Sequence, residues 1–334
     1  MDPPETSIHV DPEDALRRRT EAVASGLTVD IGGLATSLHA SDTRRADAVA
    51  HLLADAMEHP GPPQIAVRFD SDPIELPTRP PDVEFTGMDV WYDDGRYVMK
   101  DESGVIGRAD RESLVVGGDA PVLRSSFRRL FHVGMAHTLA CHARFVLHGG
   151  AMLGAGDGAL LVLGGSRAGK SSLIAVGLHC GWPAICDDMM VLREGPKNLL
   201  VAGIPRPMTV PSELARELGI TARQVARGRP RAELPRGQLR AGWWPVIGIV
   251  LAGHGSTEGG GLRTLGALEV LPALVGAFIP SPDTRLFRRF YPHAATLSRL
   301  PSWELLHDPD PSRRVRSAEK LLDSVRSLLG TAPS

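Results

Sequence analysis

A complete phosphate-loop pattern lies near the middle of the chain. Residues 164–171 read GGSRAGKS and match the pattern G-x-x-x-x-G-K-[ST] at each defined position. Glycines in such a loop allow successive backbone N–H groups to face phosphate oxygens at the positive end of a helix dipole. Lys170 then suits the β- and γ-phosphates of a nucleotide, and the Ser171 hydroxyl suits Mg²⁺. The predicted nucleotide-binding residues are Gly164, Gly165, Ser166, Arg167, Ala168, Gly169, Lys170, Ser171 and Ser172, together with Arg206 further along the chain.

Two adjacent carboxylates, Asp187 and Asp188, follow the short apolar segment 181–186, which predicts a strand. They stand 17 and 18 residues after Lys170, so one helix and one strand would return the chain to the edge that carries the loop. Two neighbouring carboxylates suit phosphoryl transfer, because one can hold Mg²⁺ while the other accepts the proton of an attacking hydroxyl. An acidic turn without chemistry is the alternative, and the nearby phosphate loop disfavours it.

Two further side chains are candidates for this site. His148 lies within the predicted strand 145–153, and a hairpin would bring it beside the phosphate-loop strand, where it could orient an Asp or contact phosphate. A histidine that is only packed at a strand end is an equal alternative. Arg206 stands between two prolines, which pre-organise a side chain able to bind phosphate in a bidentate manner. The alternative for Arg206 is a solvated loop position.

The flanking segments supply the elements that would hold these residues. Residues 159–163, ALLVL, predict a buried strand directly before the loop, and residues 172–179 predict a helix after it. This strand–loop–helix order is the one that a phosphate-binding loop requires. The loop-prone segment 206–240 carries eight arginines, so it would either recognise an acidic acceptor or remain a solvated loop.

The first part of the chain predicts a separate small module. At about 150 residues per domain, 334 residues suggest two domains, and the Gly- and Pro-containing segment 117–121 predicts their boundary. Residues 1–120 predict an α+β module with a strand pair over 27–40, a helix over 46–57 and strands over 65–69, 88–92, 96–100 and 113–116. Residues 121–334 open with a predicted helix over 123–144 and contain the phosphate loop.

Composition excludes several classes of protein. Apolar residues make up 43% and charged residues 23% of the chain, with a formal net charge of −2. These values disfavour disorder and give no overall basic field that would recruit nucleic acid. No apolar run of about 18 residues occurs, the N-terminus is acidic, and an odd number of cysteines, three, disfavours a disulfide framework. The predicted protein is cytoplasmic and has neither nucleic acid nor membrane as a partner.

The order of these motifs resembles the HPr kinase/phosphorylase superfamily. The resemblance rests on Leu147-His148-Gly149, the loop segment 161–172, and the run from Gly181 to Asp188. It implies an α/β fold with a P-loop core similar to that of phosphoenolpyruvate carboxykinase, with ATP and Mg²⁺ as cofactors. It also implies that Lys170 binds ATP, that His148 and the Asp pair form the acid/base site, and that Asp188 is the base.

The segment Pro205-Arg206-Pro207 resembles the related branch of kinases encoded with lasso-peptide and other peptide-modification clusters. The glutamate-containing signature that true HPr kinases carry after the Asp pair is missing, which points away from HPr as the acceptor. The prediction is therefore an ATP-dependent kinase that acts on a serine-type hydroxyl of a peptide or protein, with Ser171 and Asp187 as Mg²⁺ ligands. A small-molecule kinase of the free-serine type and a nucleotide-binding regulator remain the alternatives. The resemblance also makes a homo-oligomer possible.

Overall fold

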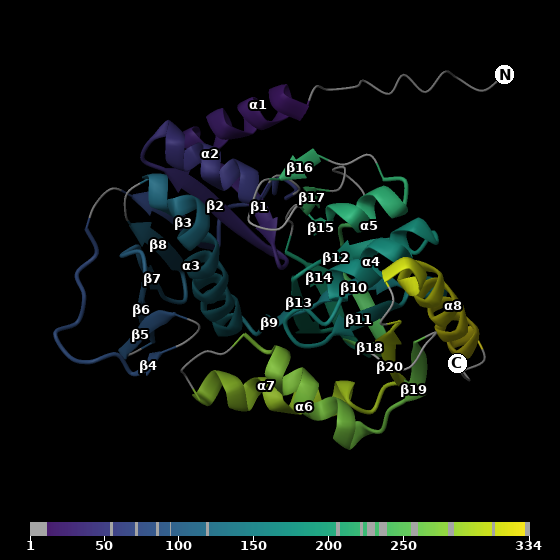
Figure 1. Cartoon of the computed structure of the whole chain (residues 1–334). Coiled ribbons are helices and arrows are strands. Elements are labelled where there is room, and N and C mark those ends of the chain that lie inside the picture. Colours follow the sequence, from purple (N-terminus) through teal and green to yellow (C-terminus); the bar gives the residue numbers. More distant parts are fainter. Residues whose placement is uncertain are drawn as a thin grey trace.

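The computed structural model describes residues 12–53, 56–70, 73–84, 87–93, 95–117, 120–204, 208–220, 223–225, 231–233, 239–254, 260–279, 284–308 and 311–330. They form a mixed α/β structure with two large sheets and one small one (Figure 1). Within these residues, no helix has both the length and the apolar character needed to cross a bilayer.

The first sheet contains eight strands in the order β1-β2-β3-β8-β7-β6-β5-β4. Its buried side chains alternate along β3, as expected for a sheet with one covered face. Helices α1, α2 and α3 contribute to the core of this sheet. The elements are α1 (Pro12–Ser25), β1 (Leu27–Ile31), β2 (Leu34–Ala40), α2 (Thr43–Leu52), β3 (Ile65–Asp70), β4 (Val83–Glu84), β5 (Met88–Asp93), β6 (Arg96–Asp101), β7 (Ile106–Ala109), β8 (Ser113–Gly117) and α3 (Ala120–Cys141).

Most predicted elements of this region are confirmed, but the second helix is shorter than predicted. The side chain of Asp42 caps α2 by accepting the N–H of Arg45 at 2.9 Å. The helix ends at Leu52 rather than at Met57. The cause is tertiary, because the carbonyl of Met57 accepts the N–H of Asp30 on β1 at 2.9 Å, which draws this segment to the edge of the sheet.

The second sheet has nine strands, and it carries helices on both faces. Strand β18 is central and pairs in parallel with both β11 and β20. The sheet consists of β9 (Phe145–His148), β10 (Gly150–Leu153), β11 (Ala159–Leu163), β12 (Ala184–Cys186), β13 (Met189–Glu194), β14 (Leu199–Gly203), β18 (Trp244–His254), β19 (Gly261–Thr264) and β20 (Ser302–His307). Its helices and the one-turn 3₁₀ helix are η1 (Ala155–Asp157), α4 (Lys170–His179), α6 (Ala267–Ala277), α7 (Thr284–Leu297) and α8 (Pro311–Gly330).

The residues of β11 divide between two cores. Ala159, Leu161 and Leu163 pack in the core that contains α6 and α7, whereas Leu160 and Val162 pack in the core that contains α4 and α8. All five residues are buried, which explains why ALLVL is continuously apolar rather than alternating. Figure 1 shows these two helix pairs on different sides of the second sheet.

The predicted single strand over 145–153 is wrong, because it is two strands with different partners. Strand β9 pairs with β13, and β10 pairs with β11 and β12. The chain changes partner at Gly149, where an added Cβ would lie 2.8 Å from the carbonyl oxygen of Val162. The close backbone approach therefore requires glycine at the point where the strand breaks.

The segment predicted to be loop-prone, 206–240, contains regular structure in its described parts. Three short strands form a separate sheet in the order β15 (Thr209–Pro211), β17 (Arg231–Glu233) and β16 (Arg223–Val225). Helix α5 (Ser212–Glu217) follows β15 directly.

The two large sheets share a core. Helix α3 lies beyond the predicted boundary at residue 120, yet its buried side chains pack with those of the first sheet. The same core includes Val146 of β9 and Val191 of β13. The first sheet is therefore joined to the second by continuous apolar packing, which fixes the position of β9 and β13.

Candidate active site

The glycine-rich segment connects the end of β11 to the start of α4. Its backbone turns through positive φ angles at Gly164 (146°), Arg167 (66°) and Gly169 (97°). At Gly164 an added Cβ would lie 2.6 Å from the carbonyl oxygen of Ala252 on β18, so only glycine fits against that strand. The amide of Ala168 donates to the carbonyl of Gly165 at 3.2 Å. The loop is thus a tight turn at the carboxyl end of a parallel strand, where ligands of α/β proteins bind.

Lys170 begins α4 and folds back over the loop. Its Nζ donates to the carbonyl oxygens of Gly164 at 2.9 Å and Gly165 at 3.0 Å. The residue is 8% exposed. Burial lowers the pKa of Lys170, while the nearby carboxylates of Asp188 and Asp187 act in the opposite direction. The buried ammonium group of Lys170 is therefore held against the backbone of the loop.

Asp187 and Ser171 meet across the same edge of the sheet. The Ser171 hydroxyl, in the first turn of α4, donates to Oδ1 of Asp187 at 2.9 Å. Asp187 follows β12 and is buried. Helix α4 and strand β12 therefore bring a hydroxyl and a carboxylate together, as the spacing of 16 residues between them allows.

Asp188 faces a different partner. Its Oδ1 lies 3.2 Å from Nδ1 of His148, and this carboxylate is 26% exposed. The backbone of Asp188 has a φ of 79°, which is uncommon outside glycine although Asp tolerates it better than most residues. The N–H of Gly149 donates to the carbonyl of Asp188 at 3.2 Å. The strand pair thus holds Asp188 in a conformation that turns the two adjacent carboxylates to separate neighbours.

The predicted route of His148 to the site is wrong. The hairpin beside the phosphate-loop strand is made by β10 and β11, whereas His148 ends β9. His148 reaches the site because β9 pairs with β13, with His148 opposite Met189 and hence next to Asp188. Because the strand breaks at Gly149, β9 pairs with β13 and β10 pairs with β11, so His148 lies outside the β10–β11 hairpin.

The other predicted residues differ in where they lie. Ser166 and Arg167 are exposed on the loop, and Ser172 is half-buried in the first turn of α4. Gly165 has open space where a Cβ would stand. Arg206 lies outside the described residues.

His307 belongs to this region, although the sequence analysis did not single it out. It ends β20 and is 2% exposed. Its ring packs against Gly169, where an added Cβ would lie 2.5 Å from Nε2 of His307. The parallel pairing of β11, β18 and β20 brings their carboxyl ends to one edge. A histidine at the end of an apolar strand was the available signal, but only the strand order connects it to the loop.

The oxygen atoms of Ser171 and Asp187 are of the kind that Mg²⁺ accepts. Within the described part of the chain, no group of three or more His, Cys, Asp and Glu side chains gathers into a metal site. Mg²⁺ commonly binds through one or two protein oxygens together with substrate phosphates. Ser171 and Asp187 offer two protein oxygens of this kind side by side.

Comparisons with known proteins give little beyond this geometry. No family model matches the chain, and no curated protein matches its sequence. Among solved structures, the chain is similar to the Hpr(Ser) kinase/phosphatase from Coxiella burnetii. That match has 13% sequence identity and a TM-score of 0.30, and it covers 55% of this chain and 98% of the other.

Proposed function

We propose that the protein is an ATP- and Mg²⁺-dependent kinase that transfers the γ-phosphoryl group to a serine-type hydroxyl of a peptide or protein. The observation that carries this proposal is the division of the Asp pair beside a glycine-rich loop. Asp187 contacts Ser171, and Asp188 contacts His148. Nucleotide binding alone does not require a base, so an Asp188 held by His148 favours transfer over binding alone.

The loop and Lys170 would bind the nucleotide phosphates. Lys170 donates to two loop carbonyls without ligand, and phosphate oxygens are stronger acceptors for an ammonium group. The negative charge of a bound phosphate would also raise the pKa of Lys170, against the lowering that burial causes. Ser171 and Asp187 would hold Mg²⁺, which when bound neutralises charge on the β- and γ-phosphates.

Asp188 would accept the proton of the acceptor hydroxyl. The hydroxyl oxygen forms a bond to the γ-phosphorus, the bond from this phosphorus to the bridging oxygen breaks, and ADP leaves. His148 would hold the carboxylate of Asp188 through the 3.2 Å contact, so that one oxygen stays directed at the acceptor. Since Asp188 is partly exposed, a hydroxyl on a larger chain can approach it from solvent.

The acceptor class rests on the sequence resemblance together with this access from solvent. Arg206 and the basic segment 206–240 are the proposed contacts to an acidic acceptor. A free-serine kinase would use the same Asp188 and His148, so the acceptor has to be identified by experiment.

The test is incubation of the full chain with Mg²⁺, ATP and candidate acceptors, followed by mass spectrometry for a mass increase of one phosphoryl group. Serine-containing peptides and free serine are compared in parallel, each with the Asp188→Asn variant as the matched control. Phosphorylated peptide that is missing with Asp188→Asn supports the proposal. Nucleotide binding without any phosphorylated product would instead identify a regulator, and phosphorylated free serine alone would identify the small-molecule kinase.

A further inference from the structure

Two arginines meet at the end of the β9–β13 pair that lies away from His148 and Asp188. Arg193 is near the end of β13, and Arg144 directly precedes β9, where Leu192 pairs with Phe145. Both guanidinium groups lie by the ring of Trp243, with their Cζ atoms 4.4 Å from the ring centroid for Arg193 and 6.0 Å for Arg144. The three side chains form one cluster, which we call the Arg144/Arg193 cluster.

The positive charges of this cluster lack a carboxylate partner in the described part of the chain. Arg144 donates only to backbone carbonyls, from Nε to Gly32 at 3.3 Å and from Nη1 to His142 at 3.2 Å. The Nε of Arg193 is buried and has no hydrogen-bond partner among the described residues. Burial lowers the pKa of Arg144 and the charge of Arg193 lowers it further, while Asp30 raises it without forming an ion pair.

Several arginines elsewhere in the described part of the chain do have a carboxylate partner. Arg17, Arg45 and Arg79 each form an ion pair with a nearby Asp. Two half-buried like charges oppose each other, and a buried donor without an acceptor is costly. Stacking on Trp243 compensates part of that cost but supplies no acceptor to the remaining N–H groups. An oxyanion would supply both the negative charge and the acceptor atoms.

We propose that Arg144, Arg193 and Trp243 form a binding site for a phosphate-type dianion, separate from the glycine loop. Two guanidinium groups match the charge of about −1.5 to −2 that a phosphate group carries near neutral pH. Arg193 stands four residues beyond Met189 on β13, or about 13 Å at 3.3 Å per residue. A phosphate in this cluster therefore lies beyond the reach of Asp188, the residue proposed to act at the transferred group.

The cluster also sits where the two large sheets meet. An added Cβ on Gly33, in the β1–β2 turn, would lie 3.0 Å from Nε1 of Trp243. Arg144 donates to Gly32 of the same turn. A bound dianion would thus be held next to a contact between the first sheet and the second, so its binding should stabilise the whole chain rather than one sheet.

The test is a titration of the full chain with inorganic phosphate at constant ionic strength and pH. Tryptophan fluorescence and the thermal midpoint are followed together, first in the wild type and then in Arg193→Gln. We expect a saturable response in the wild type and a phosphate affinity at least about tenfold lower in Arg193→Gln, as loss of a charge-assisted contact predicts. Trp243→Phe should remove the fluorescence change while keeping a thermal shift. A parallel titration with O-phosphoserine shows whether free phosphate or a phosphorylated side chain binds more tightly.

Two controls make the result decisive. Lys170→Met removes the charge of the glycine loop, and we expect it to keep the phosphate response of the cluster. Arg263→Gln changes an exposed arginine that already has carboxylate partners, and it should also keep the response. If Arg193→Gln does not fold, Arg193→Lys retains the charge and loses only the planar donor arrangement, so it should show an intermediate affinity.

Two outcomes would overturn the proposal. A response that disappears in Lys170→Met and persists in Arg193→Gln would assign phosphate to the glycine loop alone. A response that rises without saturation, equally in all variants, would be a general salt effect. Because no ATP or acceptor is present, these outcomes do not depend on whether the protein transfers phosphate.

Discussion

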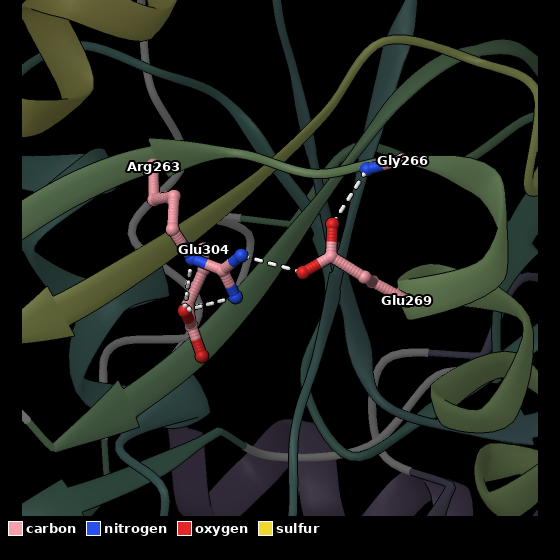
Figure 2. Close-up of polar contacts among 4 residues, drawn as sticks. All are labelled: Arg263, Gly266, Glu269 and Glu304. Carbon is pink, nitrogen blue, oxygen red and sulfur yellow. Dashed lines mark hydrogen bonds and ion pairs between the residues drawn. The ribbon is translucent and has the colours of Figure 1, made fainter.

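Two clusters of basic and acidic side chains beside the second sheet differ in how their charges are satisfied. Arg263 on β19 bonds to Glu304 on β20 at 2.9 and 3.1 Å and to Glu269 in α6 at 2.5 Å, and Glu269 also accepts the N–H of Gly266 (Figure 2). The side chains of Arg263 and Glu269 are exposed, and that of Glu304 is half-buried. At the glycine loop, by contrast, Lys170 is buried and bonds only to backbone carbonyls in the described contacts.

The pKa shifts of the charged groups differ between the two clusters in the same way. The hydrogen bonds that Arg263 donates to Glu269 and Glu304 raise the pKa of Arg263, and the Gly266 N–H together with Arg263 lowers the pKa of Glu269. Arg263 and Glu269 are thus each stabilised in the charged form. Burial has the opposite effect on Lys170, whose charged form is disfavoured. The exposed cluster satisfies its own charges, whereas the loop cluster keeps charges that a ligand would satisfy better.

The largest expected effect follows from removing the proposed base. Asp188→Asn keeps the shape of the side chain, and Asn tolerates the positive φ of this position. Phosphoryl transfer should fall by about 10²–10⁴-fold, the usual contribution of a general base, while ATP binding is retained. Steady-state kinetics and a nucleotide-binding titration measure the two quantities separately. Glu269→Gln is the matched change in the exposed cluster and should leave transfer unaltered. Full activity in Asp188→Asn would place the base elsewhere.

The second prediction concerns Lys170, whose replacement should change nucleotide affinity and stability in different ways. Lys170→Met should weaken Mg·ATP binding by about tenfold to a hundredfold, since a bond to a charged group contributes roughly 1.5–3 kcal/mol. The thermal midpoint should stay unchanged or rise, because the variant no longer buries an ammonium group. Calorimetric titration and thermal unfolding check both parts. Unchanged ATP affinity would contradict the role of the loop.

The same lysine predicts a pH dependence. Its pKa in the folded chain is below the usual 10.5, so between these two values the unfolded state binds more protons. The contribution of Lys170 to stability therefore increases as pH rises toward 10.5. The free energy of unfolding measured over this pH range should include a part that rises with pH in the wild type. This part, which comes from Lys170, should be missing in Lys170→Met.

A smaller effect concerns the shape of the loop. Gly169→Ala introduces a Cβ at a φ of 97° and 2.5 Å from Nε2 of His307. The left-handed backbone alone costs about 1–2 kcal/mol, so we expect a lower thermal midpoint and weaker ATP binding. Gly165→Ala is the matched control for stability, because its Cβ would meet no atom within 4 Å. Equal midpoints in the two variants would contradict both parts of this expectation, the cost of the left-handed backbone and that of the contact with His307.

The smallest effect belongs to the exposed cluster. The pKa of Glu269 is lowered from its usual 4.5, so its contribution to stability is present above about that pH and is lost as pH falls through the lower folded value. Glu269→Gln should remove this component from the acid side of the stability profile. Thermal unfolding between neutral and acidic pH measures the difference. A change of turnover in the same variant would show that the cluster is coupled to the site.

The local sequence pattern was sufficient to predict most helices and strands, but not the segments with which they pair. The strand over 159–163 and the loop that follows it could be predicted because glycines and a continuous apolar run restrict the backbone locally. The end of α2 could not, since pairing of Met57 with β1 overrides helical spacing. The break at Gly149 was also missed, because it depends on the approach of Val162 from another strand.

The sequence by itself determined that a lysine, a hydroxyl and two carboxylates gather near the loop, at spacings that one helix and one strand can close. It also named His148, although by a wrong route, and it did not single out His307. Only the tertiary structure decided how they divide, with Asp187 directed to Ser171 and Asp188 to His148. Adjacent residues have nearly the same spacing to any distant motif, so spacing cannot separate them. The backbone turn at Asp188 and the pairing of β9 with β13 do separate them, and strand pairing between distant segments is set by packing rather than by local sequence.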